Sequence, residues 1–522
     1  MKNTVKSKTN WDNDTVKKAL KIKFSCGNNG YEELISQNIP LPSQRTLRRR
    51  LQQINFQPGI LHDVFDFLKI KIENFKDERE KDCCLILDEM AITPGQNYDN
   101  TTSNYIGFIT VGDEPSSTFA THALVFMVAG VLSRWKQTVA YHFTGDSING
   151  EYLGNFVKQI LIKCSNIGLN VICVTSDMGS SNQSFWKSYG VIAGRYTLTN
   201  NFFQHPDVPQ KKIFIIADPV HLFKNIRMAL LNNKTIELPE NVVAQHNLQH
   251  NLVQASHIKE LVDYQDKLNF KLAPKLHEQD LTPSHFQTMR VSSATNVISH
   301  SVSSGLKFLA DELKKPKLLT TAWFLDRVEQ WFKLMTSRHP VFALSKCNED
   351  AYNCAIKFLN DFIDLFERIK IGYKKTWKPC QKGVLISTKS ILDIQEYLLT
   401  VQNYSFVLTG RFTQDCLKNL FSLVRAKQLV PNALQFKANL KLLMLSQYMK
   451  DITKGSYEMD ERQEFSDFLE LIKQKKTRPA NLNPPPVLTE EQPITELNLN
   501  NAELNALNCI SGYLISSIKK KL

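Results

Sequence analysis

Three apolar runs of the sequence end in an aspartate, and this pattern limits the fold more than any other feature. Asp88 follows "CCLIL", Asp177 follows "NVICVTS" and Asp218 follows "KKIFIIA". A short apolar run bounded by turn residues is typical of a buried strand. In α/β sheets, ligand-binding side chains usually lie at the carboxyl ends of the strands. The pattern therefore predicts an α/β domain with acidic side chains at one edge of its sheet.

The order of the predicted elements narrows the fold class. Several strand-like segments fill residues 80–146, among them "SNYIGFITVGD" at 103–113. A helix follows at 149–168, and two further strand-like segments end at Asp177 and Asp218. Antiparallel-looking strands followed by helix, strand, helix-like stretch and strand are the order of an RNase H-like α/β fold.

Helical periodicity replaces the strand pattern after about residue 228. We therefore predict an RNase H-like catalytic domain that is interrupted by a mostly helical insertion and preceded by a helix-turn-helix. The expected boundaries are 13–55 for the helix-turn-helix, 80–227 for the first part of the catalytic domain, 228–405 for the insertion, 406–455 for the second part of the catalytic domain, and 479–522 for a linker with a truncated C-terminal region.

The N-terminal region predicts DNA binding. A helix that ends at Gly27, a second short helix, and a basic helix that starts at Pro42-Ser43 form a helix-turn-helix pattern. The net charge of +13 favours an anionic partner such as nucleic acid. A solvated basic helix is the alternative interpretation. The arginines expected to contact DNA are Arg45, Arg48, Arg49 and Arg50.

The cysteines and the hydropathy of the chain indicate a compartment. The ten cysteines are scattered without zinc-binding spacing, which is typical of reduced core residues. The N-terminus has no secretory signal, and no apolar run reaches about 18 residues. We therefore expect no membrane span and a cytosolic or nuclear protein, and DNA binding favours the nucleus.

Asp88 and Asp177 are the candidate metal ligands that the residues themselves suggest. Two Mg²⁺ or Mn²⁺ ions held by such carboxylates can activate one oxygen and stabilise the leaving oxygen in phosphodiester cleavage or transfer. The alternative is that each aspartate only caps a turn. Glu89 should face the opposite side of the strand from Asp88, so we expect it to have a supporting or structural role.

Four segments carry a resemblance to a known family. In chain order they are "LILDEMAI", "SDMGSSNQSFW", "ADPVHLFKNIR" and "FTQDCLKNLFSLVRAK". Together they resemble the P element transposases and the related THAP-domain transposases. The resemblance implies Mg²⁺-dependent cut-and-paste transposition, with transposon ends and target DNA as partners and a homo-oligomer as an open alternative. It also implies that Asp88 is the first catalytic aspartate, Asp177 the second, and Asp415 the acid that opens the late motif, all three holding metal.

The sequence departs from the family pattern at the late motif. The family's catalytic glutamate lies three residues after the acid that Asp415 matches, and here that residue is Lys418. A lysine brings positive charge to a place where divalent cations need negative charge, so we expect impaired catalysis. The sequence also has no pattern that matches the family's zinc-coordinating THAP finger, and we expect its C-terminal region to be cut short, as in a truncated copy or a partial gene model.

Nucleotide binding is predicted from the resemblance alone. The stretch at 275–309, "KLHEQDLTPSHFQTMRVSSATNVISHSVSSGLKFL", is similar to the family's GTP-binding insertion, although the chain has neither a P-loop nor a dinucleotide-binding motif. Each candidate contact could equally be an ordinary residue on a surface helix. The predicted GTP contacts are Lys275, Arg290, Asn296 and Asp326.

Three functions are consistent with this pattern. The first is an active DNA transposase in which Asp415 substitutes for the missing glutamate. The second is a decayed or domesticated descendant that binds DNA but has impaired catalysis. The third is a nucleotide-regulated assembly factor that uses the insertion and performs no chemistry. Lys418 favours impaired strand cleavage with DNA or nucleotide binding partly retained.

Overall fold

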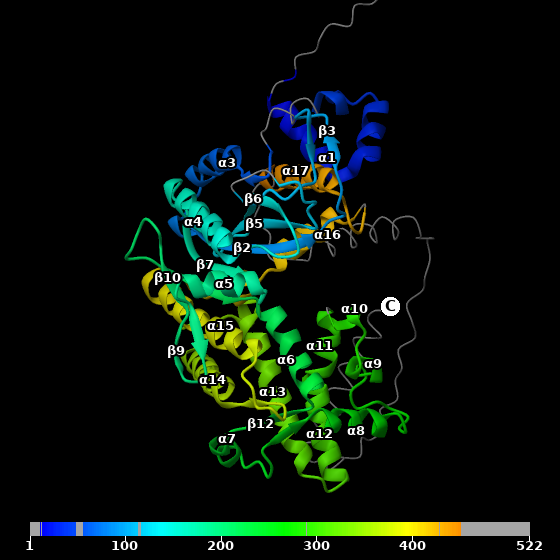
Figure 1. Ribbon diagram of the computed structural model, residues 1–522, viewed down its shortest axis with the longest axis vertical. Helices are drawn as coiled ribbons and strands as arrows, with labels where there is room; N and C mark the ends of the chain where they lie inside the picture. Colours follow the sequence, from blue (N-terminus) through cyan, green and yellow to red (C-terminus); the bar gives the residue numbers. More distant parts are fainter. Residues whose placement is uncertain are drawn as a thin grey trace, which may run out of the picture. The chain divides into compact units, whose positions relative to one another are not determined.

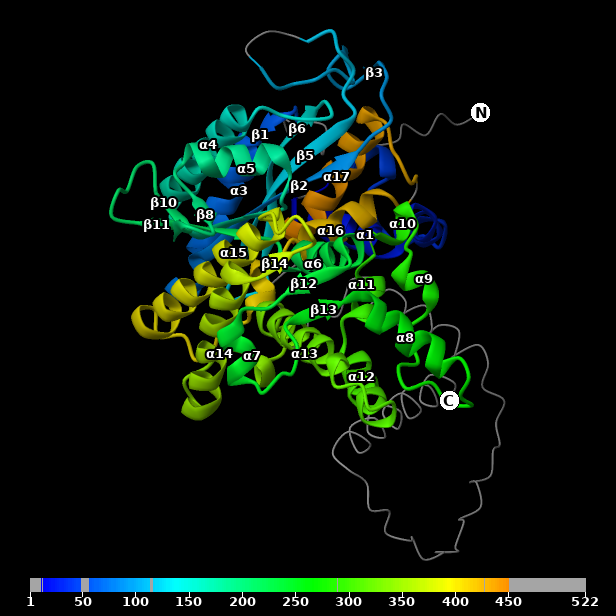
Figure 2. The same ribbon diagram turned by 60° about the horizontal axis from the view of Figure 1, so that its bottom comes forward.

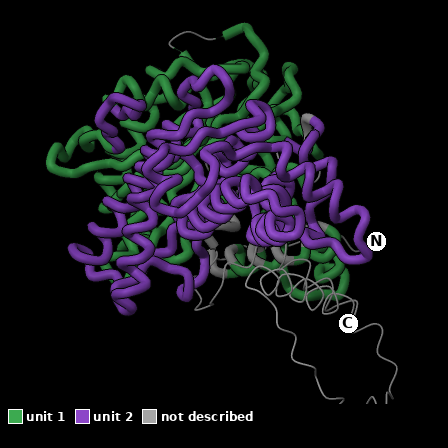
Figure 3. Tube along the Cα trace, turned by 90° about the horizontal axis from the view of Figure 1, so that it is seen from below, with its two compact units in different colours: residues 1–190, 202–215, 414–455 green, residues 191–201, 216–413, 456–522 purple. Residues whose placement is uncertain are grey.

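The computed structural model describes residues 11, 13–47, 56–112, 116–288, 290–426 and 428–449. They divide into two compact units, which Figure 3 shows in different colours. The described residues of unit 1 fall within 11–190, 202–215 and 414–449, and those of unit 2 within 191–201 and 216–413. The boundary falls within one strand, β11, so the chain leaves unit 1 at Ile215 and returns to it at Gln414.

Unit 1 is built on a seven-stranded sheet with the order β1-β6-β5-β2-β7-β11-β10. β2 pairs antiparallel with β5 and parallel with β7, and β5 pairs antiparallel with β6. These strands lie side by side in Figure 1. Their bounds are β1 Gly59–Ile60, β2 Asp82–Ala91, β5 His122–Gly130, β6 Lys136–Thr144, β7 Asn170–Ser176, β10 Phe202–Gln204 and β11 Lys212–Ala217.

Helices cover both faces of this sheet. His142 of β6 stacks on Phe156 of α4, with ring centroids 3.9 Å apart, whereas its neighbours Tyr141 and Phe143 contact Phe436 of α17. Because successive side chains of a strand point to opposite faces, α4 and α17 lie on opposite sides of the sheet, as Figure 2 shows. The helical segments of unit 1 whose two ends are both described are α1 Asn13–Ser36, α3 His62–Glu73, η1 Glu78–Lys81, α4 Gly150–Asn166, α5 Ser180–Ser188, α16 Asp415–Val424 and α17 Ala433–Met449.

The expected helix end at Gly27 is wrong. α1 runs without interruption from Asn13 to Ser36. Val16, Ala19 and Tyr31, buried in one apolar cluster, lie on both sides of the glycine, and an isolated glycine inside a helical pattern is tolerated. The predicted helix start at Pro42-Ser43 is confirmed, because the Ser43 hydroxyl accepts a hydrogen bond from the Thr46 backbone N–H at 3.2 Å and residues 44–47 are helical.

The expected strand at 103–113 is also wrong for most of its length. Only Asn104–Ile106, β4, is a strand, and it pairs with β3, Asn97–Asp99, in a separate two-stranded sheet. Gly107 has a φ of +119°, and a Cβ there would lie 2.0 Å from the Gly95 carbonyl oxygen. The chain therefore turns at Gly107, in a backbone conformation and a space that favour glycine, and β4 ends at Ile106.

Unit 2 is mostly helical and contains small sheets. β12, β13 and β14 form a three-stranded sheet, and β8 pairs with β9. The strands are β8 Ile192–Gly194, β9 Thr197–Asn200, β12 Thr235–Glu237, β13 Leu252–Gln254 and β14 Lys370–Ile371. The helical segments are α6 Pro219–Asn233, α7 Glu240–Gln245, α8 Ala255–Gln265, α9 Glu278–Leu281, α10 His285–Thr288, α11 Val291–Val297, α12 His300–Glu312, α13 Lys317–Met335, η2 Pro340–Phe342, α14 Glu349–Arg368, α15 Pro379–Glu396, η3 Tyr397–Val401 and η4 Thr409–Phe412.

Helix α13 lies in the core of unit 2. Its Trp331 is fully buried, stacks on Phe362 of α14 with ring centroids 5.3 Å apart, and donates its indole N–H to Thr388 of α15. A buried indole needs such an acceptor, so this bond fixes α13 against both neighbours. Across the described parts of both units, every helix is too short or too polar to cross a bilayer.

Candidate functional site

The end of β2 carries two acidic side chains. β2 is buried from Asp82 to Leu87 and becomes half-buried at Asp88 and Glu89. Opposite partners in an antiparallel pair share a face of the sheet, and the register pairs Asp88 with Val125, which pairs in turn with Tyr141. Since Tyr141 contacts α17, Asp88 lies on the α17 side of the sheet and Glu89 starts on the other side, as expected from strand alternation.

Asp177 follows the parallel neighbour of β2. The last paired residues of β2 and β7 are Ile86 and Thr175. If the same register is continued by two residues along each chain, Asp88 lies level with Asp177. Oδ1 of Asp177 accepts hydrogen bonds from the Gly179 backbone N–H at 2.9 Å and from the Asn182 side chain at 2.6 Å. These bonds fix the turn that leads into α5. Within the described part of the chain no donor reaches Oδ2, which is left for another ligand.

Glu89 is close enough to both aspartates to sense their charge. Burial raises the pKa of the Glu89 carboxyl to about 7, and the negative charges of Asp177 and then of Asp88 add to the shift. Carboxylates gathered without a compensating cation repel each other in this way. Hard oxygens and excess negative charge both suit a divalent cation such as Mg²⁺ or Mn²⁺. Within the described residues, however, no three of these carboxylates bring ligand atoms within 4.8 Å of one another. We expected a supporting or structural role for Glu89, and strand alternation alone gave no sign of this coupling.

Helix α16 brings the late motif to the same strand. Gln414, fully buried at the N-terminus of α16, donates its side-chain N–H to the Leu87 carbonyl at 2.7 Å. The apolar stripe of α16, namely Leu417, Leu420, Phe421 and Val424, is buried, and the helix packs against β2 and α17. The sequence therefore anchors α16 one residue before Asp88, although the two segments are far apart along the chain.

A second contact attaches the segment after α16 to the extension of β2. Thr93 donates its backbone N–H to the Pro431 carbonyl at 3.0 Å and its hydroxyl to the Val430 carbonyl at 2.9 Å. The late segment is thus held to β2 on both sides of the acidic pair. Asp415 is the first residue of α16, where the helix dipole favours an acid, and Lys418, half-buried, lies one turn later.

Asp218 takes the capping role that was the alternative for these aspartates. Its buried carboxylate accepts the His221 backbone N–H at 3.2 Å and begins α6, with Pro219 at the first helical position. Proline is preferred there because a backbone N–H at the first helical position has no acceptor within the helix, so its absence costs no hydrogen bond. Asp218 belongs to unit 2, and the acids of the candidate site belong to unit 1.

Comparison with known proteins identifies both units. The family model "TNP-like, RNase H N-terminal domain" matches residues 56–190, and the model "TNP-like, GTP-binding insertion domain" matches residues 220–347. The "Transposable element P transposase" of Drosophila melanogaster is 24% identical over 440 residues, which are 83% of this chain. The human "DNA transposase THAP9" is 25% identical over 322 residues, 60% of this chain.

The chain belongs to the P element transposase and THAP9-like family. The solved "Drosophila P element transposase strand transfer complex" resembles its fold with a TM-score of 0.71 at 23% identity, over 85% of this chain and 94% of that chain. These matches confirm the predicted RNase H-like fold with a helical insertion. The chain spans 53% of the length of the fly protein and 34% of that of the human protein.

The GTP contacts predicted for this family member are not brought together by hydrogen bonds. Lys275 is exposed in a turn, and Arg290 is exposed before α11. Asn296 donates to the buried Asp280 at 3.2 Å. Asp326 of α13 accepts from Lys307 at 2.5 Å and is hydrogen-bonded to a histidine of α12. All four lie within the segment that matches the GTP-binding insertion model, and their roles in GTP binding stay predictions.

A buried arginine in the same insertion was not anticipated. Arg227 of α6 is fully buried and donates one N–H to the Thr288 carbonyl at 3.2 Å. Its Nε and Nη1 find no hydrogen-bond partner in the ranges that the structure describes. Burial lowers the pKa of the guanidinium, and the charge of Asp280 opposes that shift. Its position in an apolar helix gave no sequence signal that distinguished it from a surface arginine.

The predicted DNA-contacting arginines are described only in part. Arg45 is exposed on the helix that begins after Ser43. Two contacts join this helix to α1. The Tyr31 hydroxyl of α1 donates a hydrogen bond to the Pro42 carbonyl at 2.7 Å, and Leu47 packs into the apolar cluster of Val16 and Ala19. These contacts hold the basic helix against α1. Arg48, Arg49 and Arg50 lie outside the described residues, as does the predicted C-terminal region at 479–522.

Proposed function

We propose that this chain is a P element-like DNA transposase for cut-and-paste transposition whose strand cleavage is impaired at Lys418. The observation that supports the proposal most is the anchoring of α16 on β2 by Gln414 and Leu87. Through this contact, the segment that matches the family's late motif packs against the strand that carries Asp88. Membership in the family supports the reaction class, and the acids of unit 1 support a metal-dependent mechanism.

The acids would act by holding and orienting divalent metal. Asp88, Asp177 and Asp415 would supply the ligands for Mg²⁺ or Mn²⁺, and Glu89 would set the charge around them. When bound, two such ions activate the attacking oxygen and stabilise the leaving oxygen of a phosphodiester. The hydrogen bonds to Oδ1 of Asp177 keep that carboxylate in one orientation, as a metal ligand requires.

Lys418 weakens this proposed metal site by its charge. Two unit charges 4 Å apart interact by about 4 kcal/mol at an effective dielectric constant of about 20. Exchanging the family's glutamate for lysine removes a ligand and adds repulsion, so metal affinity should fall by orders of magnitude wherever the ammonium stays near the acids. The same charge leaves phosphate-backbone contacts favourable, which fits a descendant that still binds DNA.

DNA and GTP are the proposed partners of the whole protein. Arg45 and the three following arginines would contact phosphates, and DNA binding implies residence in the nucleus. The insertion would bind GTP and regulate the assembly of the protein on DNA, with a homo-oligomer as the assembled form. Lys275, Arg290, Asn296 and Asp326 remain the proposed nucleotide contacts.

A cleavage assay tests the proposed chemistry. The full chain is incubated with Mg²⁺ or Mn²⁺, GTP and duplexes taken from the DNA that flanks its gene on either side, and nicking and strand transfer are measured. We expect little product from the wild type and a gain of at least ten-fold from Lys418→Glu. Asp88→Ala in the Lys418→Glu background should abolish that gain.

The contrary outcomes separate the alternatives. Robust wild-type cleavage that Asp88→Ala removes would contradict the impairment while supporting the transposase. Absence of cleavage in both proteins, together with salt-dependent DNA binding that Arg45→Gln weakens, would favour a DNA-binding descendant. A rise in thermal stability with GTP, without DNA binding or cleavage, would favour the nucleotide-regulated assembly factor.

A further inference from the structure

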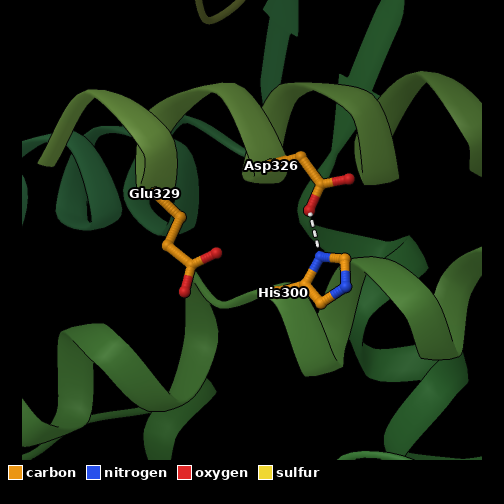
Figure 4. A group of neighbouring side chains, drawn as sticks. All are labelled: His300, Asp326 and Glu329. Atoms are coloured by element: carbon orange, nitrogen blue, oxygen red, sulfur yellow. Dashed lines mark hydrogen bonds and ion pairs between the residues drawn. The ribbon is translucent and has the colours of Figure 1, made fainter. Parts of the chain in front are cut away.

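Three side chains of the insertion converge between α12 and α13. His300 opens α12, and Asp326 and Glu329 lie one turn apart on the same face of α13. One ligand atom of each lies within 4.8 Å of the others. Figure 4 shows the two carboxylates pointing from α13 toward the imidazole ring. No other group of this kind occurs in the part of the chain that the structure describes.

We propose that His300, Asp326 and Glu329 bind one Zn²⁺ ion that joins α12 to α13. One imidazole and two carboxylates are the mixed nitrogen and oxygen donor set that zinc accepts, and three protein ligands leave a fourth position for water. The imidazole nitrogen argues against Mg²⁺, which prefers oxygen ligands. This site differs in residues and in unit from the metal site proposed at Asp88 and Asp177.

The separation of two ligand atoms already suits a zinc ion. Nδ1 of His300 lies 3.1 Å from Oδ1 of Asp326. Bonds of about 2.0–2.1 Å in a tetrahedron separate ligand atoms by about 3.3–3.4 Å, so zinc can replace the proton between these atoms almost without movement. Glu329, whose side chain is 18% exposed, has three rotatable bonds with which to close the remaining distance.

Neighbouring groups hold the ligands in place. Nε2 of His300 is 3.3 Å from the Ser304 hydroxyl, and such a contact fixes the ring orientation of a ligand histidine. Oδ2 of Asp326 accepts from Lys307, and Oε1 of Glu329 pairs with Lys333 at 3.0 Å. The two ammonium groups show that the carboxylates attract cations. They also compete with a metal ion, so removing Lys307 should strengthen metal binding.

Zinc titration of the full chain tests the site. The protein is freed of metal with a chelator, and ZnCl₂ is titrated calorimetrically at pH 8 without nucleotide, because a ligand histidine must lose its proton. We expect one equivalent to bind at this site. His300→Gln and Glu329→Gln should each weaken its affinity at least ten-fold. The matched control is Glu312→Gln, which removes an exposed carboxylate elsewhere on α12 and should change nothing.

Lys307→Gln gives the most specific readout. If Lys307 competes with the metal for Asp326, this variant should bind zinc more tightly than the wild type, whereas a purely structural ion pair predicts no gain. Unchanged affinity in both His300→Gln and Glu329→Gln would place the zinc elsewhere and overturn the proposal. Binding that requires added GTP would also overturn it, because the site needs protein ligands alone. If His300→Gln does not fold, Glu329→Gln and Lys307→Gln decide.

Discussion

Gln414 donates its side-chain amide N–H to the backbone carbonyl of Leu87, 2.7 Å away and 327 residues earlier in the chain. The bond forms just beyond Ile86 and Thr175, where the paired register of β2 and β7 ends. It returns the chain to unit 1 after residues 216–413, which belong to unit 2. Through this contact, the helix that carries Lys418 packs against the strand that carries Asp88 and Glu89.

Replacing Gln414 should weaken the attachment of α16 to β2. Gln414→Leu leaves the buried Leu87 carbonyl without this donor, and an unsatisfied buried group costs about 1–3 kcal/mol. The loss should appear as faster hydrogen exchange in β2 and α16, measured by mass spectrometry. Asn419→Ala, half-buried on the same helix, is the control and should stay within about 0.5 kcal/mol. Equal effects of the two variants would contradict the anchoring role.

Neutralising Glu89 should stabilise unit 1 at high pH. The folded pKa of this carboxyl is about 7 against an ordinary value of 4.5, so the folded state retains a proton that the unfolded state releases. Stability is therefore lost as the pH rises through 7, by up to about 3 kcal/mol. Glu89→Gln should be more stable than the wild type at pH 8 and close to it below pH 4.5, as measured by urea denaturation.

The control for this prediction is Glu73→Gln, which changes an exposed carboxylate at the end of α3. Because this side chain is exposed, the substitution should change stability at pH 8 by less than about 0.5 kcal/mol. Saturating Mn²⁺ should reduce the advantage of Glu89→Gln, because a bound cation compensates the gathered carboxylates. If Glu89→Gln has no advantage at pH 8, the acids are not coupled as described.

The strand-end acids could be found from the sequence because their signal is local. Asp88 and Asp177 follow apolar runs that fold as buried strands, and the strand order then predicts that they are neighbours. Lys418 was recognised as a departure only through the family's late motif. The continuity of α1 across Gly27 was missed because a single glycine was given more weight than the apolar positions around it.

Other parts of the site depend on distant contacts that no local pattern encodes. Gln414 has no feature that predicts a bond to Leu87, because that carbonyl is 327 residues away. Strand alternation predicts that Glu89 starts on the face opposite to Asp88, and the structure agrees. The negative charges of Asp88 and Asp177 nevertheless raise the pKa of Glu89, because all three acids lie near the same end of the sheet. The convergence of His300 with Asp326 likewise requires the packing of α12 on α13.

A buried ion pair in unit 1 should be sensitive to the loss of either partner. Lys437 of α17 donates to Asp99 at 2.7 Å, and both side chains are less than a tenth exposed. Lys437→Met leaves a buried carboxylate unpaired, and breaking such a pair costs about 3–5 kcal/mol. Lys81→Met, which removes the partner of the exposed Glu78, should cost less than about 1 kcal/mol in the same urea denaturation. Similar losses in both variants would contradict the burial of the pair.

His142 should make unit 1 less stable in mild acid. Burial lowers the pKa of this imidazole to about 4 in the folded state, from 6.5. Between pH 6.5 and pH 4, the unfolded chain therefore binds a proton at His142 that the folded chain does not bind. The free energy of unfolding falls as the pH drops below 6.5, by up to about 1.4 kcal/mol per pH unit. His142→Phe keeps a ring against Phe156 and should lose this part of the pH dependence. Identical pH profiles of stability would count against the buried, neutral histidine.

The most direct test of the central claim is the affinity of unit 1 for Mn²⁺, measured on the full chain by electron paramagnetic resonance. Wild type, Lys418→Glu, and Lys418→Glu combined with Asp88→Asn are compared, so that binding elsewhere cancels. We predict that Lys418→Glu binds Mn²⁺ at least ten-fold more tightly than the wild type and that Asp88→Asn removes the gain. Equal affinity of the wild type and Lys418→Glu would contradict the claim that Lys418 disables the metal site.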